Sequence, residues 1–441
     1  MAGWKRVVAE TVTNIEEHYD LLKFRMRERL GGRDPIMILP YRGYGRQDKL
    51  YLRGRVLEDR GIAAASDNDT IWNNLVNMYK RFKSNEIPYA RLLVRFQGRE
   101  QEIETDVEGF FEVWVEPVEP LPQDQKWIHI ELELLYPQRE GYPHVKAEGQ
   151  VLVPPPRAQF GVISDIDDTV VHTDATNLVR MARTVFLGNA RTRLPFPGVA
   201  AFYRALLWGP EGKDLNPLFY VSSSPWNLYD LLSQFFHIED IPLGPVLFLR
   251  DWGISETEFL PIRHKAFKSE VIQKIMDFYH DLPFILIGDS GQEDPEIYYK
   301  MVQKYPGRIA AVYIRNVSQD LPRADEVRKL AEEVVKVGST LILADNTLPM
   351  AEHALEKGWI SHKALEDIRY EKELDEAPPS KLELLLGDEE EEEEAEPVKI
   401  EGRDKQETEQ AVRGGAIEEA LDQDGEQGKE PPPVIVTGDE E

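Results

Sequence analysis

Acidic side chains follow two apolar segments that have the composition of buried strands. Asp165 and Asp167 end one such segment, and Asp289 and Asp294 follow the apolar run Phe284–Ile287. Asp165 and Asp167 lie two residues apart, so in a continuing strand they point the same way and repel each other unless a cation neutralises them. The chain contains no cysteine, so the ligands of that cation would be oxygen atoms, which favours a hard cation such as Mg²⁺.

A hydroxyl-rich segment and a lysine complete the set of chemical groups. Ser222 and Ser224 follow the apolar run Leu218–Val221, and Lys265 and Lys268 lie in a helical segment before the next acidic strand end. In an open parallel sheet, ligands bind beyond the carboxyl ends of the strands, where these residues are expected to meet. Two acidic strand ends, hydroxyl groups and a lysine fit a metal-assisted phosphoryl transfer with an aspartate nucleophile.

The sequence that carries these residues alternates between short apolar runs and helical patterns. Apolar runs without alternation, separated by helices, are typical of a parallel sheet that is buried on both faces. We therefore predict an α/β domain over residues 159–376. Its first five strands are expected at Phe160–Ser164, Leu218–Val221, Pro245–Leu249, Phe284–Ile287 and Ile309–Ile314.

The preceding sequence has a different period. Apolar residues alternate with polar ones between turn signals, which predicts a small antiparallel β-sandwich domain over residues 36–153. Its strands are expected at Leu50–Leu57, Ala90–Phe96, Gly109–Val115 and Trp127–Tyr136. Residues 1–35 are predicted to be an amphipathic N-terminal helix region, which we expect to pack on its own protein, and residues 154–158 a proline-rich linker.

Charge is concentrated at the end of the chain. The formal net charge is −28, and residues 381–441 contribute 22 acidic against 6 basic residues, net −16. Residues 377–441 are therefore expected to be an acidic disordered tail. The negative charge argues against nucleic-acid binding.

No apolar window approaches the length of a membrane span, so we expect a soluble, cytoplasmic protein, for which a peripheral membrane contact stays open.

These motifs occur in the order of a known superfamily. Asp-x-Asp-x-Thr at 165–169, the strand serine, the lysine and Gly-Asp-x4-Asp at 288–294 resemble the four motifs of haloacid-dehalogenase-type phosphatases. Four longer segments resemble the phosphatidate phosphatase family typified by the fungal actin-patch protein: Ser164–Thr169, Ser224–Tyr229, Leu249–Gly253 and Gly288–Tyr298. This resemblance implies a Rossmann-like haloacid-dehalogenase-type fold for the α/β domain.

The resemblance also implies roles for the first motif. Asp165 would attack phosphorus to form an aspartyl-phosphate. Asp167 would protonate the leaving alcohol and then activate water, and Thr169 would orient it.

The other motifs would bind the metal and the substrate. The resemblance implies that Mg²⁺ is held by Asp165, the backbone carbonyl of Asp167, and Asp289, with Asp294 as a further ligand or as a partner of the ligands. Ser222 and Lys268 would hold the phosphoryl oxygens. Ser224 could share the role of Ser222. Lys265 stays open as the motif lysine, because many relatives have a histidine directly before that lysine. Here His264 precedes Lys265, whereas Phe267 precedes Lys268.

The function expected from this resemblance is a Mg²⁺-dependent hydrolysis of phosphatidate to diacylglycerol and phosphate. The gaps between the motifs hold no large cap domain, which fits a bulky or membrane-borne substrate. Two alternatives stay open at this point. One is a phosphatase for another bulky phosphomonoester, and the other is a non-catalytic adaptor with a vestigial phosphatase domain.

Overall fold

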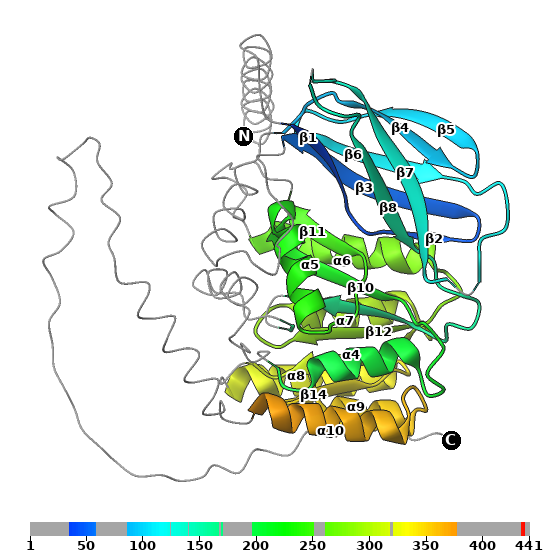
Figure 1. Cartoon of the computed structure of the whole chain (residues 1–441). Coiled ribbons are helices and arrows are strands. Elements are labelled where there is room, and N and C mark those ends of the chain that lie inside the picture. The colour runs from blue at the N-terminus through cyan, green and yellow to red at the C-terminus, as the bar shows by residue number, and fades with distance from the viewer. Residues whose placement is uncertain are drawn as a thin grey trace, which may run out of the picture. The chain divides into compact units, whose positions relative to one another are not determined.

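The computed structural model places the described residues in two sheets and the helices around one of them (Figure 1). The chain divides into two compact units, Met1–Ala377 with Val434–Glu441, and Pro378–Pro433. All described residues belong to the first unit. They are 35–58, 86–123, 125–139, 141–166, 169–170, 196–250, 261–317, 321–376 and 434–436. The predicted N-terminal helix and most of the predicted tail lie outside these ranges.

The first sheet contains eight strands that are joined in one hydrogen-bonded network. Their order is β1-β3-β2-β8-β7-β4-β5, and β6 pairs with β3. Every pair is antiparallel except β2 with β8. The two-sheet sandwich predicted for this region is therefore not confirmed. The strands are β1 Ile36–Pro40, β2 Gly43–Arg46, β3 Lys49–Glu58, β4 Arg91–Phe96, β5 Arg99–Glu104, β6 Phe110–Val115, β7 Trp127–Tyr136 and β8 Lys146–Leu152.

Alternation of side chains explains why these segments form strands with one buried face. In β7, Ile128, Ile130, Leu132 and Leu134 are buried while the residues between them are more exposed. They pack into a separate apolar cluster of the antiparallel sheet. Gln97–Gly98 connects β4 to β5, and both residues have positive φ, which is the geometry that a two-residue hairpin loop requires.

The second sheet contains seven strands in the order β11-β10-β9-β12-β13-β14-β15. The strands from β11 to β14 are parallel, and β15 pairs antiparallel with β14. Residues of the predicted tail thus form a strand at the edge of this sheet. The strands are β9 Gly161–Asp165, β10 Leu218–Pro225, β11 Val246–Arg250, β12 Phe284–Asp289, β13 Ile309–Arg315, β14 Leu341–Ala344 and β15 Val434–Val436.

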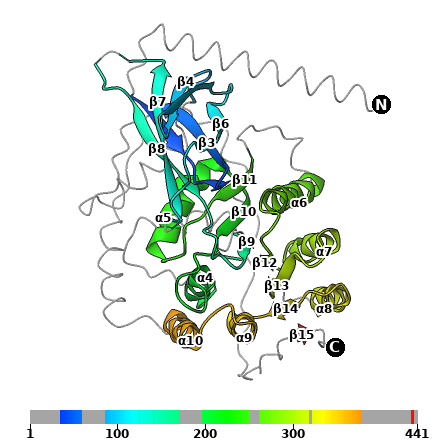
Figure 2. The ribbon, with the colours of Figure 1, turned by 90° about the vertical axis from the view of Figure 1, so that its right-hand side faces the viewer.

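Helices cover both faces of the parallel sheet, as Figure 2 shows. Helices α6, α7 and α8 pack on one face, and α4, α5, α9 and α10 pack on the other, each through its own apolar cluster. This explains the continuous apolar runs of the strands, since both faces are buried. The helices are α4 Val199–Trp208, α5 Tyr229–Ile238, α6 Pro261–Phe278, α7 Asp294–Lys304, α8 Leu321–Lys336, α9 Leu348–Glu356 and α10 His362–Glu376, with the short 3₁₀ helix η1 at Trp226–Leu228.

None of the helices within the described ranges is long and apolar enough to cross a membrane.

Candidate active site

Asp165 is the last residue of β9, which lies between β10 and β12 in the parallel sheet. All five residues of β9 are buried, and Asp165 is 1% exposed. The strand end is fixed from behind, because the Ser164 hydroxyl donates to the backbone carbonyl of Asp165 at 2.7 Å and also contacts the Tyr203 hydroxyl at 2.7 Å. A carboxylate is thus held at the carboxyl end of the central part of the sheet.

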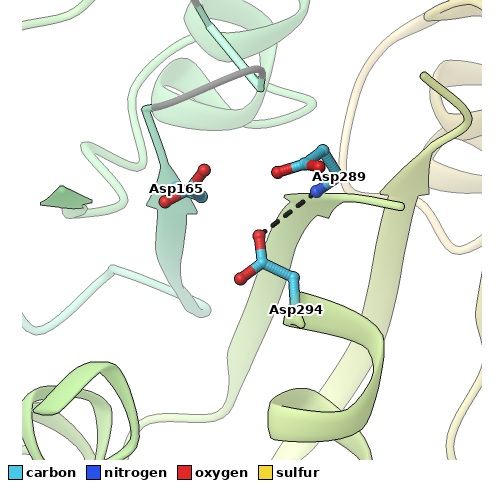
Figure 3. A group of neighbouring side chains, drawn as sticks. All are labelled: Asp165, Asp289 and Asp294. Atoms are coloured by element: carbon cyan, nitrogen blue, oxygen red, sulfur yellow. Dashed lines mark hydrogen bonds between the residues drawn. The ribbon is translucent and has the colours of Figure 1, made fainter. Parts of the chain in front are cut away.

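Asp289 and Asp294 come to the same place from the neighbouring strand and the helix that follows it (Figure 3). Asp289 ends β12, and Asp294 begins α7. The backbone N–H of Asp289 donates to Asp294 Oδ2 at 3.2 Å. Gly288 makes this approach possible, since a Cβ at that position would lie 2.3 Å from Asp294 Oδ2.

The two oxygens of Asp289 have different surroundings. Oδ1 accepts hydrogen bonds from the backbone N–H groups of Gly291 at 2.7 Å and Gln292 at 2.9 Å. Oδ2 is buried and accepts no hydrogen bond from any described residue. Burial, and next the charge of Asp294, raise the pKa of Asp289 to about 7, although the two N–H groups and Lys268 act in the opposite direction. One lone carboxylate oxygen is therefore available to a cation.

Lys268 of α6 brings a positive charge to the three carboxylates. Its Nζ lies 2.7 Å from Asp165 Oδ1 and also donates to Asp294 Oδ1. Burial alone would lower the pKa of Lys268, but the charges of Asp165 and Asp294 outweigh it and raise the pKa. The lysine is therefore protonated and fixed between two acids.

The charges of this cluster do not balance. Ligand oxygens of Asp165, Asp289 and Asp294 lie within 4.8 Å of one another, and all three side chains are buried around one lysine. Like charges so close in a buried place repel strongly unless a cation joins them. Carboxylate oxygens are the ligands that hard divalent cations prefer, so the cluster fits such an ion.

A family model described as "Phosphatidate phosphatase APP1, catalytic domain" matches residues 160–316. The matched segment includes Asp165, Lys268, Asp289 and Asp294. Residues 160–316 are thus similar to the catalytic domain of APP1-type phosphatidate phosphatases, and we refer to the α/β domain that contains them as the APP1-like domain.

Two curated proteins show the same similarity. Phosphatidate phosphatase APP1 of Saccharomyces cerevisiae is 36% identical over 174 residues, which are 38% of this chain and 28% of the yeast protein. An uncharacterized protein of Schizosaccharomyces pombe is 32% identical over 167 residues, which are 37% of this chain and 26% of that protein. The matched region thus spans about a quarter of the length of these relatives.

The solved structures that align with this chain have little similarity to it. A calcium-binding mutant of Bacteroides uniformis β-glucuronidase 2 aligns with 70% of this chain and 39% of its own, at 10% identity and a TM-score of 0.23. A likeness this low supports no inference about fold or function.

The APP1-like domain also places two predicted hydroxyl residues near the acids. Thr169 is buried, and its Oγ1 donates to Asp165 Oδ2 at 3.3 Å. Ser222 is buried in β10, one residue beyond Val221, which pairs with Asp165. Asp167 lies outside the described residues.

Ser224 and Lys265 are the residues that the sequence leaves open as alternatives to Ser222 and Lys268. The side chains of Ser224 and Lys265 also lie outside the described residues. Among the described residues, Lys268 is the lysine that contacts the acids.

Arg315 is a buried charge of the APP1-like domain that the sequence analysis missed. It ends β13 beside Asp289 in the register of the sheet. Its guanidinium lies 3.6 Å from the centre of the Phe196 ring, and Nη2 donates to Thr347 Oγ1 at 3.4 Å. Burial lowers the pKa of Arg315 to about 9, while Tyr203 and Asp289 act in the opposite direction. Its place directly after an apolar run is the signal that could have found it.

Proposed function

We propose that this chain is a Mg²⁺-dependent phosphatidate phosphatase, which hydrolyses phosphatidate to diacylglycerol and phosphate through an aspartyl-phosphate. The observation that carries the proposal is the buried cluster of Asp165, Asp289, Asp294 and Lys268 at the carboxyl end of a parallel sheet, inside the segment that matches the APP1 catalytic domain. We also propose that this domain has the haloacid-dehalogenase-type fold, which the sheet of parallel strands and the order of its motifs support.

Asp165 and Asp289 are the residues that would hold the metal. Asp289 Oδ2 accepts no hydrogen bond within the described residues, so it suits a ligand. Asp294 bonds the Asp289 N–H with one oxygen and Lys268 with the other. Asp294 therefore orients both neighbours in our proposal. When bound, Mg²⁺ supplies positive charge that offsets the charge of phosphate and carboxylates.

Asp165 is the proposed nucleophile. One of its carboxylate oxygens forms a bond to phosphorus while the bond from phosphorus to the diacylglycerol oxygen breaks. Asp167, by the resemblance of its motif, gives its proton to that leaving oxygen. Asp167 then takes a proton from water, whose oxygen bonds to phosphorus and releases phosphate as Asp165 is restored.

Lys268 and Ser222 are the proposed holders of the phosphoryl group. The lysine ammonium can donate to phosphoryl oxygens, and its contacts with Asp165 and Asp294 fix its position before the substrate arrives. Ser222 lies on the strand that adjoins β9, so its hydroxyl can serve the same group from the other side. Thr169 keeps the Asp165 carboxylate oriented through its hydrogen bond.

Phosphate release from phosphatidate in detergent micelles tests this proposal. We expect Asp165→Asn to abolish release, because the amide cannot form the aspartyl-phosphate, and EDTA to abolish it in the unchanged protein. Asp345→Asn is a matched control, since Asp345 is exposed at the end of β14 and bonds Asn316. Undiminished release by Asp165→Asn, or in EDTA, would contradict the mechanism.

A substrate panel separates phosphatidate from the other bulky phosphomonoesters, such as a phosphoprotein or a nucleic-acid end. Preferred turnover of one of these would replace phosphatidate as the substrate while leaving the chemistry in place. A protein that binds no Mg²⁺ and hydrolyses no aryl phosphate would instead be the adaptor.

Because the proposed substrate is a lipid, we also propose a peripheral contact with membranes, which flotation of the full chain with phosphatidate liposomes would detect.

A further inference from the structure

A six-residue segment of the antiparallel sheet contacts two elements of the APP1-like domain. This segment, Tyr41–Arg46, connects β1 to β2 and includes β2; we refer to it as the bracing segment. Its first residues contact η1 and α5, which follow β10 directly in the chain. Its last residues contact the end of α6, the helix that carries Lys268. The bracing segment is thus linked to the elements that supply two proposed phosphoryl ligands.

The contact with η1 and α5 is aromatic and hydrogen-bonded. The ring of Tyr41 stacks on that of Trp226, with centroids 4.4 Å apart and an interplanar angle of 23°. The guanidinium of Arg53 in β3 lies 4.8 Å from the centre of the Trp226 ring. The backbone N–H of Arg42 donates to the Tyr229 hydroxyl at 2.8 Å. Tyr41, Trp226 and Tyr229 are all buried, so water does not weaken these contacts.

The contact with α6 uses the other end of the bracing segment. The Tyr44 ring packs edge-on against Phe278, with centroids 5.3 Å apart. The Tyr279 hydroxyl donates to the backbone carbonyl of Gly45 at 3.0 Å, and Arg46 Nη1 donates to the carbonyl of Phe278 at 2.9 Å. Six consecutive residues therefore join two elements that are far apart in the sequence.

The end of β10 has an irregularity that makes this support consequential. Its pairing with β11 shifts register between Ser222 and Pro225, immediately after the proposed phosphoryl ligand. Such irregularities disrupt the regular ladder of backbone hydrogen bonds and re-aim nearby side chains. Trp226 directly follows Pro225, so the stacking of Tyr41 fixes the chain just after the place where the ladder is disturbed.

We propose that the bracing segment positions the carboxyl end of β10, so that Ser222 is set for the phosphoryl group, with Tyr41 as its principal positioning residue. The antiparallel sheet thereby contributes to the site without touching the reacting atoms. This inference rests on the proposed function for the identity of the group that Ser222 meets, but not for the ordering of the β10 end.

Tyr41→Ala in the full chain tests the proposal, because it removes the stacked ring without changing the identity of any proposed catalytic residue. We expect the KM for a small aryl phosphate and the inhibition constant of inorganic phosphate to rise about tenfold. This tenfold change is well below the ~100-fold loss of activity that a displacement of 1 Å can cause. Hydrogen exchange of the amides in 218–229 should accelerate. Tyr41→Phe keeps the ring and should restore all three values.

Leu132→Ala is the matched control for general destabilisation. Leu132 is buried in the apolar cluster of the antiparallel sheet and does not belong to the clusters of the APP1-like domain. Its loss should lower the Tm but leave the KM, the inhibition by phosphate and the exchange of 218–229 unchanged. All measurements are made well below the Tm of each variant.

Two results would overturn the proposal. One is a Tyr41→Ala protein with unchanged KM, phosphate inhibition and exchange, and the other is a Leu132→Ala protein with equally large changes. If the unchanged protein hydrolyses no phosphomonoester, the proposed function fails by itself. The exchange of 218–229 in the two alanine variants then still decides whether Tyr41 orders the end of β10.

Discussion

Asp289 shows how one residue of the site opposes the stability of the metal-free fold. Its folded-state pKa of about 7 lies above the usual value of 3.8, so the folded protein holds this proton more tightly than the unfolded chain. Protonation of Asp289 therefore stabilises the folded state. This stabilisation is complete below pH 3.8 and is lost as the pH rises to about 7. Above that pH the metal-free protein carries a buried, repelled carboxylate.

We therefore expect Asp289→Asn to stabilise the metal-free protein at pH 8 by about 2 kcal/mol and to have little effect at pH 4. The amide keeps an acceptor for the N–H groups of Gly291 and Gln292 but carries no charge. Urea unfolding in EDTA measures the difference. Added Mg²⁺ should stabilise the unchanged protein and not the variant. A variant that is less stable than the unchanged protein at pH 8 without metal would contradict this account.

Residue types at strand ends allowed much of the acid cluster to be predicted. Asp165 and Asp289 each end an apolar run, Asp294 lies five residues after Asp289, and parallel strands bring their carboxyl ends together. The contacts of Lys268 with two specific carboxylates could be found only from the structure, because sequence spacing does not give side-chain distances. Arg315 was missed because its burial against Phe196 depends on a segment 119 residues away in the chain.

At the scale of elements, side-chain periodicity located most of the strands. The predicted strand at Trp127–Tyr136 coincides with β7, and the run Ile309–Ile314 lies within β13. β5 was not predicted, because five of its six residues are exposed and no apolar alternation marks it. The order of the parallel strands also required the structure, since local sequence patterns do not specify which strands pair.

Helix α9 contacts β13 through a buried histidine that titrates well below its usual pKa. His353 is 1% exposed, and its Nδ1 contacts the Tyr313 hydroxyl at 2.9 Å. Burial, and next the charge of Lys357, lower the pKa of His353 to about 4. The unfolded chain binds a proton at His353 more readily than the folded protein does. The contribution of neutral His353 to stability is therefore complete above pH 6.5 and is lost as the pH drops to about 4.

We expect His353→Gln to remove this part of the pH dependence, because glutamine can bond Tyr313 and does not titrate. The unchanged protein should lose about 2 kcal/mol more than the variant between pH 7 and pH 4. Urea unfolding at a series of pH values measures this. His362→Gln, at an exposed position of α10, is the control and should follow the unchanged protein. Parallel pH curves for His353→Gln and the unchanged protein would refute the assignment.

At the scale of the whole molecule, the acidic end of the chain and the parallel sheet are connected by β15. Composition predicted residues 377–441 as one disordered tail, and its charge of −16 is more than half of the total. Val434–Val436 nevertheless pairs with Leu341–Leu343 of β14. Three aliphatic residues in a long polar segment are too short a run to predict a strand. The unpaired edge of β14 provides the backbone groups that make the pairing favourable.

Two truncated chains test what β15 contributes. A chain ending at Pro433 lacks β15 but keeps the acidic segment, whereas a chain ending at Glu376 lacks both. We expect hydrogen exchange of the β14 amides that face β15 to accelerate at least tenfold in both chains, since exposed edge groups open readily. Phosphatase activity should be unchanged, because β12, β13 and β14 separate β15 from Asp165 on β9. Acceleration in the shorter chain alone would assign the protection of β14 to the acidic segment instead of to β15.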